Sequence, residues 1–245
     1  MATRAGFAPF HRLDRRAVMI CAGVVFAVIA GGFAYDMATR SSPNPFTYRW
    51  YTHVHAVAYG AWLILLIAQV ALVRTGNTAQ HRRVGRIGFA LVPILLITGP
   101  MVAILRRVDT PLDPERLAFM GTQFTNVIGC TSLLAAGLLL RRDVATHKRL
   151  MLMGSIAITE PGFSRVIADP LHAVLGEGYW QYYVETYIGT LSLMLALGAY
   201  DVATRGRPHP AWTAAFLWVL ANEWIATWLY YQPFWVGWMA ALTGH

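Results

Sequence analysis

Charged residues are scarce in this 245-residue chain, at 13% of the sequence, about half the share that a soluble domain carries. Lysine is almost absent, because 19 of the 20 basic residues are arginines and Lys148 is the exception. A retinal protein needs a lysine inside a membrane span, so that class is excluded. The two cysteines, Cys21 and Cys130, lie far apart in apolar runs, which excludes a disulfide framework. P-loop, dinucleotide and serine-nucleophile motifs are also missing.

Apolar sequence is what the chain has in quantity, since 56% of its residues are hydrophobic. A membrane-crossing helix takes about 20 residues, and no long stretch alternates with the period of a strand. The sequence therefore predicts an all-α, polytopic membrane helix bundle. It forms one integral membrane domain, residues 1–245, with seven spans near 17–34, 56–73, 87–105, 117–140, 150–167, 180–200 and 211–231. The fifth span is the weakest, because Glu160, Pro161 and Arg165 interrupt it.

The basic residues indicate how these spans are threaded. With seven spans, 14 of the 20 basic residues lie on the side of the N-terminus, and cytoplasmic loops carry the excess of Lys and Arg. We therefore predict a bacterial inner (cytoplasmic) membrane protein with a cytoplasmic N-terminus and a periplasmic C-terminus. Six spans fit the charges only slightly less well. Because the arginines lie in short loops between apolar runs, the charge points to topology and not to nucleic-acid binding.

Two short segments on the predicted cytoplasmic side share a pattern. Residues 81–88 read His-Arg-Arg-Val-Gly-Arg-Ile-Gly and residues 147–154 read His-Lys-Arg-Leu-Met-Leu-Met-Gly. They precede the third and fifth spans, so one interpretation is a parallel repeat of a two-helix hairpin. Basic residues at a helix N-terminus can bind phosphate or lipid headgroups. The alternative is that they only anchor helix ends at the membrane surface.

These segments, with Arg-Gly-Arg-Pro-His-Pro at 205–210, resemble a family of uncharacterised bacterial multi-pass inner-membrane proteins that carry a His-Arg-Arg-x-Gly-Arg hairpin. The resemblance covers residues 53–231 and implies a membrane location without a particular activity. The chain is also faintly similar to cytochrome b561, in which histidines on neighbouring helices hold two haems. It departs from that pattern because no histidine lies within a predicted span.

Ionisable side chains inside the spans are the strongest functional signal, because each costs about 2.5–3.5 kcal/mol to insert. Four occur: Glu160, Arg165, Glu185 and Glu223. Three amides also lie inside the spans: Gln69, Asn126 and Asn222. Gln69 and Asn126 are on polar stripes expected to face the bundle interior. From the helix rise, we expect the three acids to meet in a chamber in the outer half of the bundle. Pro161 directly after Glu160 predicts an interrupted helix, as in many transport sites.

A metal centre is the sharpest hypothesis for this chamber, since imidazole and carboxylate ligands suit zinc, iron or copper. The candidate ligands are His53, His55, Glu160, Glu185 and Glu223. Residues two apart on a helix point about 200° from each other, so the two histidines would share an ion only from an extended segment. Haem b is the alternative cofactor. It would use His55 with His172 on the outer side, or His81 with His147 on the inner side.

Three function classes follow from these patterns, and none of them identifies an enzyme. The first is a binding or redox protein whose outward-facing His/Glu site holds a metal or haem b. The second is a proton or small-solute transporter in which Glu160 and Glu223 form the relay. The third is a non-catalytic subunit of a larger membrane complex. Besides the lipid bilayer, the predicted partners are therefore other membrane subunits or a second copy of the chain.

Overall fold

The computed structural model describes residues 7–39 and 48–245. Over these residues the chain is all α-helical and has no strand, which confirms the predicted fold class. The helices are α1 (Asp14–Thr39), α2 (Trp50–Arg74), α3 (Thr78–Gly85), α4 (Ile87–Val108), α5 (Pro114–Ala118), α6 (Met120–Leu139), α7 (Val144–Ala157), α8 (Glu160–Leu175), α9 (Tyr179–Arg205), α10 (Pro210–Tyr230) and α11 (Pro233–Thr243).

Five helical stretches among the described residues are long and apolar enough to cross a membrane: Asp14–Thr39, Trp50–Arg74, Thr78–Val108, Pro114–Leu139 and Tyr179–Arg205. This is the make-up of a membrane protein. The other two predicted spans differ from these five. Residues 150–167 are divided between α7 and α8. Helix α10 is 21 residues long but contains Asn222 and Glu223 and is not among the five.

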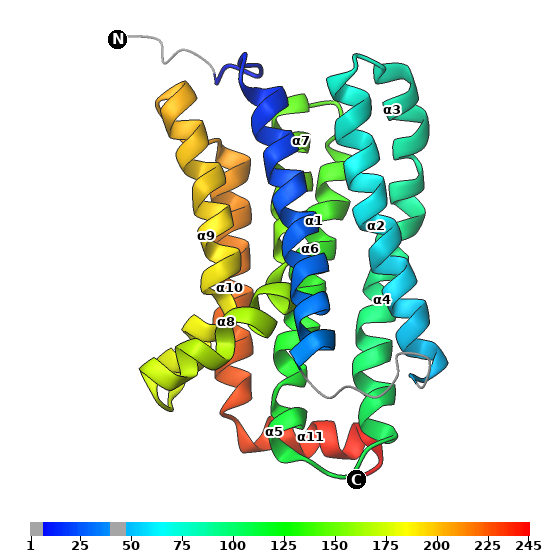
Figure 1. Ribbon diagram of the computed structural model, residues 1–245, viewed down its shortest axis with the longest axis vertical. Helices are drawn as coiled ribbons and strands as arrows, with labels where there is room; N and C mark the ends of the chain where they lie inside the picture. Colours follow the sequence, from blue (N-terminus) through cyan, green and yellow to red (C-terminus); the bar gives the residue numbers. More distant parts are fainter. Residues whose placement is uncertain (1–6, 40–47) are drawn as a thin grey trace.

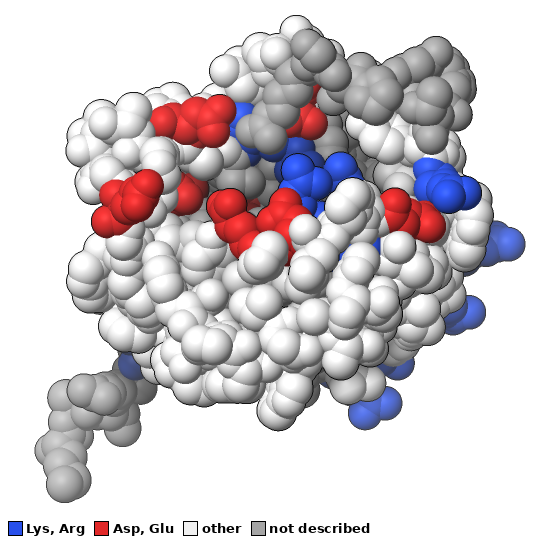
Figure 2. Space-filling view, turned by 90° about the horizontal axis from the view of Figure 1, so that it is seen from below, with Lys and Arg blue, Asp and Glu red and all other residues white. Residues whose placement is uncertain are grey.

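The helices form an elongated bundle with two different ends (Figure 1). The start of α1, the short α3 and the connections α6–α7 and α9–α10 lie at the upper end. The short α5, the C-terminus and α11, which runs across the bundle, lie at the lower end. Figure 2 looks onto the lower end and shows acidic and basic side chains gathered around its centre. The ion pairs of this end include Arg49 Nε–Asp109 Oδ2 at 3.3 Å.

The core of the bundle is centred on α6, which packs against α4, α7 and α10. Leu134 on α6 and Met153 on α7 are fully buried there, next to Trp62 of α2. The Trp62 Nε1–H donates to Ser155 Oγ over 3.2 Å. Many large apolar side chains remain exposed, for example Ile64 at 68%, as expected for a surface that contacts lipid.

The fifth predicted span is not one helix. It is divided, because α7 ends at Ala157 and α8 begins at Glu160, the place where Pro161 removes a backbone N–H. From there α8 leaves the bundle obliquely toward the lower end (Figure 1). It packs on α1 through Gly162, where an added Cβ would lie 2.7 Å from the Val28 carbonyl oxygen. The close approach of the two backbones fixes the direction of α8.

Candidate functional site

A small internal cavity lies where α6, α7, α9 and α10 meet the start of α8. Its lining combines two carboxylates, two amides and three hydroxyls with small side chains: Thr125, Asn126, Gly129, Ala157, Glu160, Tyr187, Thr190, Val219, Asn222 and Glu223. Four of the residues singled out from the sequence are therefore in this one place. We call this cavity the chamber.

Glu160 enters the chamber from the interruption between α7 and α8. It is the first residue of α8, where the free N–H groups of the first turn favour a negative side chain. Its side chain is 5% exposed, and Oε1 has no hydrogen-bond partner among the described residues. A buried, unpaired carboxylate oxygen is costly, so this position is not explained by stability.

Glu223 reaches the chamber from α10. It is also 5% exposed, and its Oε2 accepts a hydrogen bond of 3.0 Å from the Tyr183 hydroxyl. A carboxylate on the interrupted helix and one on an intact helix thus line the same cavity.

The two amides of the chamber hold the surrounding backbone. Asn126 Nδ2–H donates over 3.0 Å to the carbonyl oxygen of Ala157, the last residue of α7, whose carbonyl has no partner within its own helix. Asn222 Nδ2–H donates over 2.7 Å to the Trp218 carbonyl. The interruption of the helix is therefore stabilised by a neighbouring side chain from α6.

A row of hydroxyl groups leads from the chamber toward the lower end. Tyr187 lines the chamber and donates to Thr122 Oγ1 over 3.3 Å, which in turn lies 2.6 Å from the Tyr182 hydroxyl. The Tyr182 ring stacks on Tyr230, with centroids 4.0 Å apart. The tyrosines escaped the sequence analysis, although Tyr183 and Tyr187 are four residues apart and share a helix face.

The third acid, Glu185, does not line the chamber. It hydrogen-bonds with Gln181 and lies 3.4 Å from His172 Nδ1, while Gln181 also bonds to that nitrogen at 2.9 Å. This small group is closer to the lower end, around the junction of α8 and α9. The chamber therefore contains two acids where we expected three.

The five proposed metal ligands are not brought together. Because α2 begins at Trp50, His53 and His55 lie inside a helix and point in different directions. His53 Nε2 lies 3.1 Å from the Tyr48 carbonyl oxygen, whereas the His55 ring packs on Tyr59 at 4.3 Å. Within residues 7–39 and 48–245, no group of three or more His, Cys, Asp or Glu is arranged to hold a metal ion.

The two proposed haem pairs have different outcomes. His55 and His172 belong to α2 and α8, on opposite sides of the bundle (Figure 1). In contrast, the rings of His81 and His147 lie 6.4 Å apart at an interplanar angle of 80°. His147 Nδ1 is 2.7 Å from the Gly137 carbonyl oxygen. Gln69, with its amide nitrogen turned toward His81, is 2.6 Å from His81 Nδ1.

Arg165 lies near the interruption but is occupied by other partners. Its guanidinium lies 4.0 Å from the centre of the Phe33 ring, 3.8 Å from Asp36 Oδ2, and donates to the Pro161 carbonyl. It thus ties the first turns of α8 to α1.

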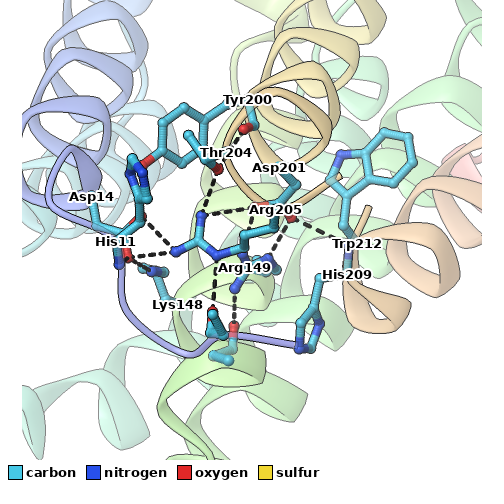
Figure 3. A network of polar contacts seen from close by, with 12 residues as sticks. His11, Asp14, Lys148, Arg149, Tyr200, Asp201, Thr204, Arg205, His209 and Trp212 are labelled. Atoms are coloured by element: carbon cyan, nitrogen blue, oxygen red, sulfur yellow. Dashed lines mark hydrogen bonds and ion pairs between the residues drawn. The ribbon is translucent and has the colours of Figure 1, made fainter. Parts of the chain in front are cut away.

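A second buried polar region, at the upper end, was missed by the sequence analysis (Figure 3). Arg149 of α7 and Asp201 of α9, both 1% exposed, form an ion pair. Beside them, the Asp14 carboxylate of α1 is 2.7 Å from Lys148 Nζ and 2.8 Å from Arg205 Nη2. Because the partners are up to 191 residues apart in sequence, spacing gives no sign of them. We call this group the ionic cluster.

His209 completes the ionic cluster from the start of α10. Its Nδ1 accepts a hydrogen bond of 3.1 Å from the Ala211 N–H and so caps the helix. Burial, and next the positive charge of Arg149, lower the pKa of His209, which keeps the ring neutral as the cap requires. Burial also lowers the pKa of Lys148, against the opposing effect of Asp14.

Comparison with protein-family models, with curated proteins and with solved structures gives no match to this chain. The functional argument therefore depends on the residues of the chamber and the ionic cluster.

Proposed function

We propose that this protein moves protons, alone or with a small solute, through the chamber between Glu160 and Glu223. The observation that carries this proposal is that two carboxylates from different helices line one internal cavity at the interruption of a helix. Two nearby carboxylates in a low-dielectric site do not both ionise readily, so such a pair is suited to hold and exchange a proton. The lining polar groups are oxygens and amides, which suit a proton or a hard cation more than a soft metal.

The hydroxyl row supports a route between the chamber and the lower end. Tyr187, Thr122 and Tyr182 are linked by distances of 3.3 Å and 2.6 Å, and hydroxyl groups both donate and accept hydrogen bonds. At the other end, the ionic cluster closes the bundle with paired charges. In this conformation the chamber is therefore connected more directly with the lower end.

The proposal includes seven spans in a bacterial inner membrane. The pair α7–α8 together makes the fifth crossing and α10 the seventh, so that all four arginine-rich segments lie at the upper end. By the positive-inside rule this end is cytoplasmic. The lower end, with α11 and its exposed Trp238, then lies at the periplasmic surface, where tryptophan is frequent.

Proton flux into proteoliposomes tests the proposal. Wild-type protein is reconstituted with a pH-sensitive dye inside and a pH gradient is applied, with and without an ionophore that prevents a membrane potential. We expect Glu160→Gln and Glu223→Gln to abolish most of the flux, because an amide does not exchange a proton. Glu185→Gln is the matched control, since this acid lies outside the chamber, and its flux should persist. Unchanged flux in both chamber variants would overturn the proposal.

A second candidate function, a redox role with haem b, is favoured by one observation. His81 and His147 are the proposed haem pair whose rings lie close together, with centroids 6.4 Å apart and planes nearly perpendicular. The hydrogen bond from His147 Nδ1 to the Gly137 carbonyl is typical of an iron- or metal-bound histidine. A haem held by this pair would also give a shared function to the two similar segments, residues 81–88 and 147–154. Purified protein should then show a haem absorption band that is lost in His147→Ala; a colourless protein from haem-supplied cells rules this function out.

A further inference from the structure

The Asp14 carboxylate sits in a set of converging donors at the upper end. Lys148 Nζ donates over 2.7 Å and the Tyr200 hydroxyl over 2.6 Å. Arg205 Nη2 donates to both carboxylate oxygens, each over 2.8 Å. Figure 3 shows these side chains pointing at Asp14 from α7 and α9. Three donors of this kind around one oxyanion are the arrangement of an anion-binding site.

The donors are held in place by the bundle and not by Asp14 alone. The Arg205 side chain is 2% exposed, and its Nη1 donates to Thr204 Oγ1 over 2.8 Å and lies 3.7 Å from Asp201 Oδ1. A small cavity continues beneath them, lined by Lys148, Tyr200 and Asp201 among others. The site would therefore remain formed if Asp14 left it.

The charges of this region require an anion. Lys148, Arg149 and Arg205 carry three positive charges and Asp201 carries one negative charge, so the group without Asp14 has a net charge of +2 (three minus one). Buried cations without a partner are strongly unfavourable. Asp14 supplies the missing negative charge from within the chain.

The residues before Asp14 lie over the same cations. The Phe7 ring faces the guanidinium groups of Arg149 at 4.5 Å and Arg205 at 5.2 Å, and its edge meets the His209 ring at 4.6 Å. The Ala8 carbonyl oxygen accepts from Arg205 Nε over 2.9 Å. Residues 7–14 thus cover the site, and their hold depends on the cations that Asp14 neutralises.

We propose that Lys148, Tyr200 and Arg205 form a binding site for a phosphate group, and that Asp14 occupies it in this structure as an internal ligand. A phosphate group offers several acceptor oxygens and a full negative charge to a lysine and a forked arginine, the pairing that proteins use for this group. Its source is either a phospholipid headgroup or a soluble phosphate. When the phosphate binds, Asp14 leaves and residues 7–13 are released. This inference does not depend on the function proposed for the chamber.

The first test measures anion binding after Asp14 is neutralised. Asp14→Asn keeps the size of the side chain but removes its charge and replaces one acceptor oxygen by an NH2 group. Binding of inorganic phosphate to the detergent-solubilised full chain is measured by calorimetry. Binding of an anionic phospholipid is measured with nanodiscs of phosphatidylcholine with and without phosphatidylglycerol. We expect at least one of the two probes to bind at least about tenfold more tightly than to wild type, which corresponds to about 1.4 kcal/mol.

The controls separate this site from general charge effects. Asp36→Asn removes an acid from the other end of α1 and should leave binding as in wild type. Arg205→Gln added to Asp14→Asn should abolish the gain. Binding of inorganic phosphate alone identifies a soluble ligand, and binding of phosphatidylglycerol alone identifies a lipid. If Asp14→Asn binds neither probe more tightly than wild type does, the proposal is wrong.

The second test uses the wild-type chain and so does not depend on a variant that folds. Arg12, between Phe7 and Asp14, is a trypsin site within the covering segment. Saturating phosphate or phosphatidylglycerol should accelerate cleavage there severalfold, because the segment is released, while a phosphate-free buffer of equal ionic strength should not. Cleavage that neither probe changes would overturn the proposal.

Discussion

The chamber and the ionic cluster are both polar and both buried, but their hydrogen bonding differs. In the ionic cluster, Arg149 bonds to Asp201 through two nitrogens and to the Ala145 carbonyl through a third. In the chamber, Glu160 Oε1 has no partner among the described residues, and Glu223 Oε2 accepts a hydrogen bond from the Tyr183 hydroxyl. One region pairs opposite charges, whereas the other places two acids on one cavity.

This difference separates a role in stability from a role in function. Removing one partner of a buried ion pair leaves the other charge unpaired and strongly lowers the stability of the fold. The ionic cluster therefore holds α1, α7, α9 and α10 together. Acids without a hydrogen-bonded cation oppose insertion into lipid, so the presence of Glu160 and Glu223 in the chamber points to chemistry. The four predictions below test this contrast on the stability of the detergent-solubilised protein, from the largest expected effect to the smallest.

Removal of one partner of the buried ion pair should have the largest effect. Asp201→Ala leaves the Arg149 guanidinium buried without its counter-ion and should lower the free energy of unfolding by about 3–5 kcal/mol. The double variant Arg149→Met with Asp201→Leu should recover more than half of this loss, because no unpaired charge remains. Chemical unfolding followed by circular dichroism measures both. A loss below about 1 kcal/mol for Asp201→Ala would contradict the assigned role.

A change in backbone packing next to the chamber should have the second largest effect. Gly162→Ala places a Cβ 2.7 Å from the Val28 carbonyl oxygen, so α1 and α8 must separate, at a cost of about 1–3 kcal/mol. Gly31→Ala is the control on α1, since nothing lies within 4 Å of its added Cβ, and a helical Gly→Ala change stabilises by up to about 1 kcal/mol. Equal effects of the two changes would show that the helices are not in close contact.

The pH dependence of the ionic cluster should be smaller. Since the pKa of His209 is lowered in the folded chain, the unfolded chain takes up this proton first, and stability falls as the pH drops through the ordinary value of about 6.5. Protonation also removes the cap on the Ala211 N–H, which is worth about 1 kcal/mol. Asp143 titrates below this range, because hydrogen bonds from Thr146 lower its pKa.

The matching variant is His209→Asn, which keeps a capping acceptor without a titrating group. Between pH 8 and pH 5.5 the wild-type Tm should fall by about 2–4 °C more than the Tm of His209→Asn, as expected for about 1 kcal/mol in a chain of this size. Parallel pH profiles of the two proteins would exclude His209 as the titrating group.

Neutralising the chamber acids should change stability least. Glu160→Gln and Glu223→Gln each remove a buried carboxyl group that has few partners, so the free energy of unfolding should stay within about 0.5 kcal/mol of wild type or rise. The same variants are the ones expected to abolish proton flux. A loss of several kcal/mol in either variant would place the chamber in the same class as the ionic cluster.

The sequence located the helices because apolar runs mark the part of a helix that lies in lipid. The predicted 87–105 and 211–231 match Ile87–Val108 and Pro210–Tyr230 closely. The second helix extends to Trp50, well before its apolar run at 56, and therefore includes both His53 and His55. The cross-lying α11 falls outside the seven predicted spans, because its 11 residues are too few to cross a membrane.

The sequence predicts how deep a residue of a span lies in the membrane more readily than it predicts in which direction its side chain points around the helix axis. Glu160 and Glu223 were expected at similar depth and do line one cavity. Glu185 was expected there too, but Tyr187 is the residue of α9 that reaches the chamber, and side chains two positions apart point about 200° away from each other. The partners of Asp14 depend on which helices are neighbours, which no local pattern reveals.

The single, uninterrupted length of α1 has a mechanical consequence. The helix holds Asp14 at its first turn and touches the backbone of Gly162 at Gly32, about 27 Å further along by helix rise. Because α1 is one continuous helix with tertiary contacts at both points, a shift or rotation of the helix at one contact also displaces the other. A displacement of the N-terminal turn therefore reaches a point two residues from Glu160, across most of a hydrocarbon thickness of about 30 Å.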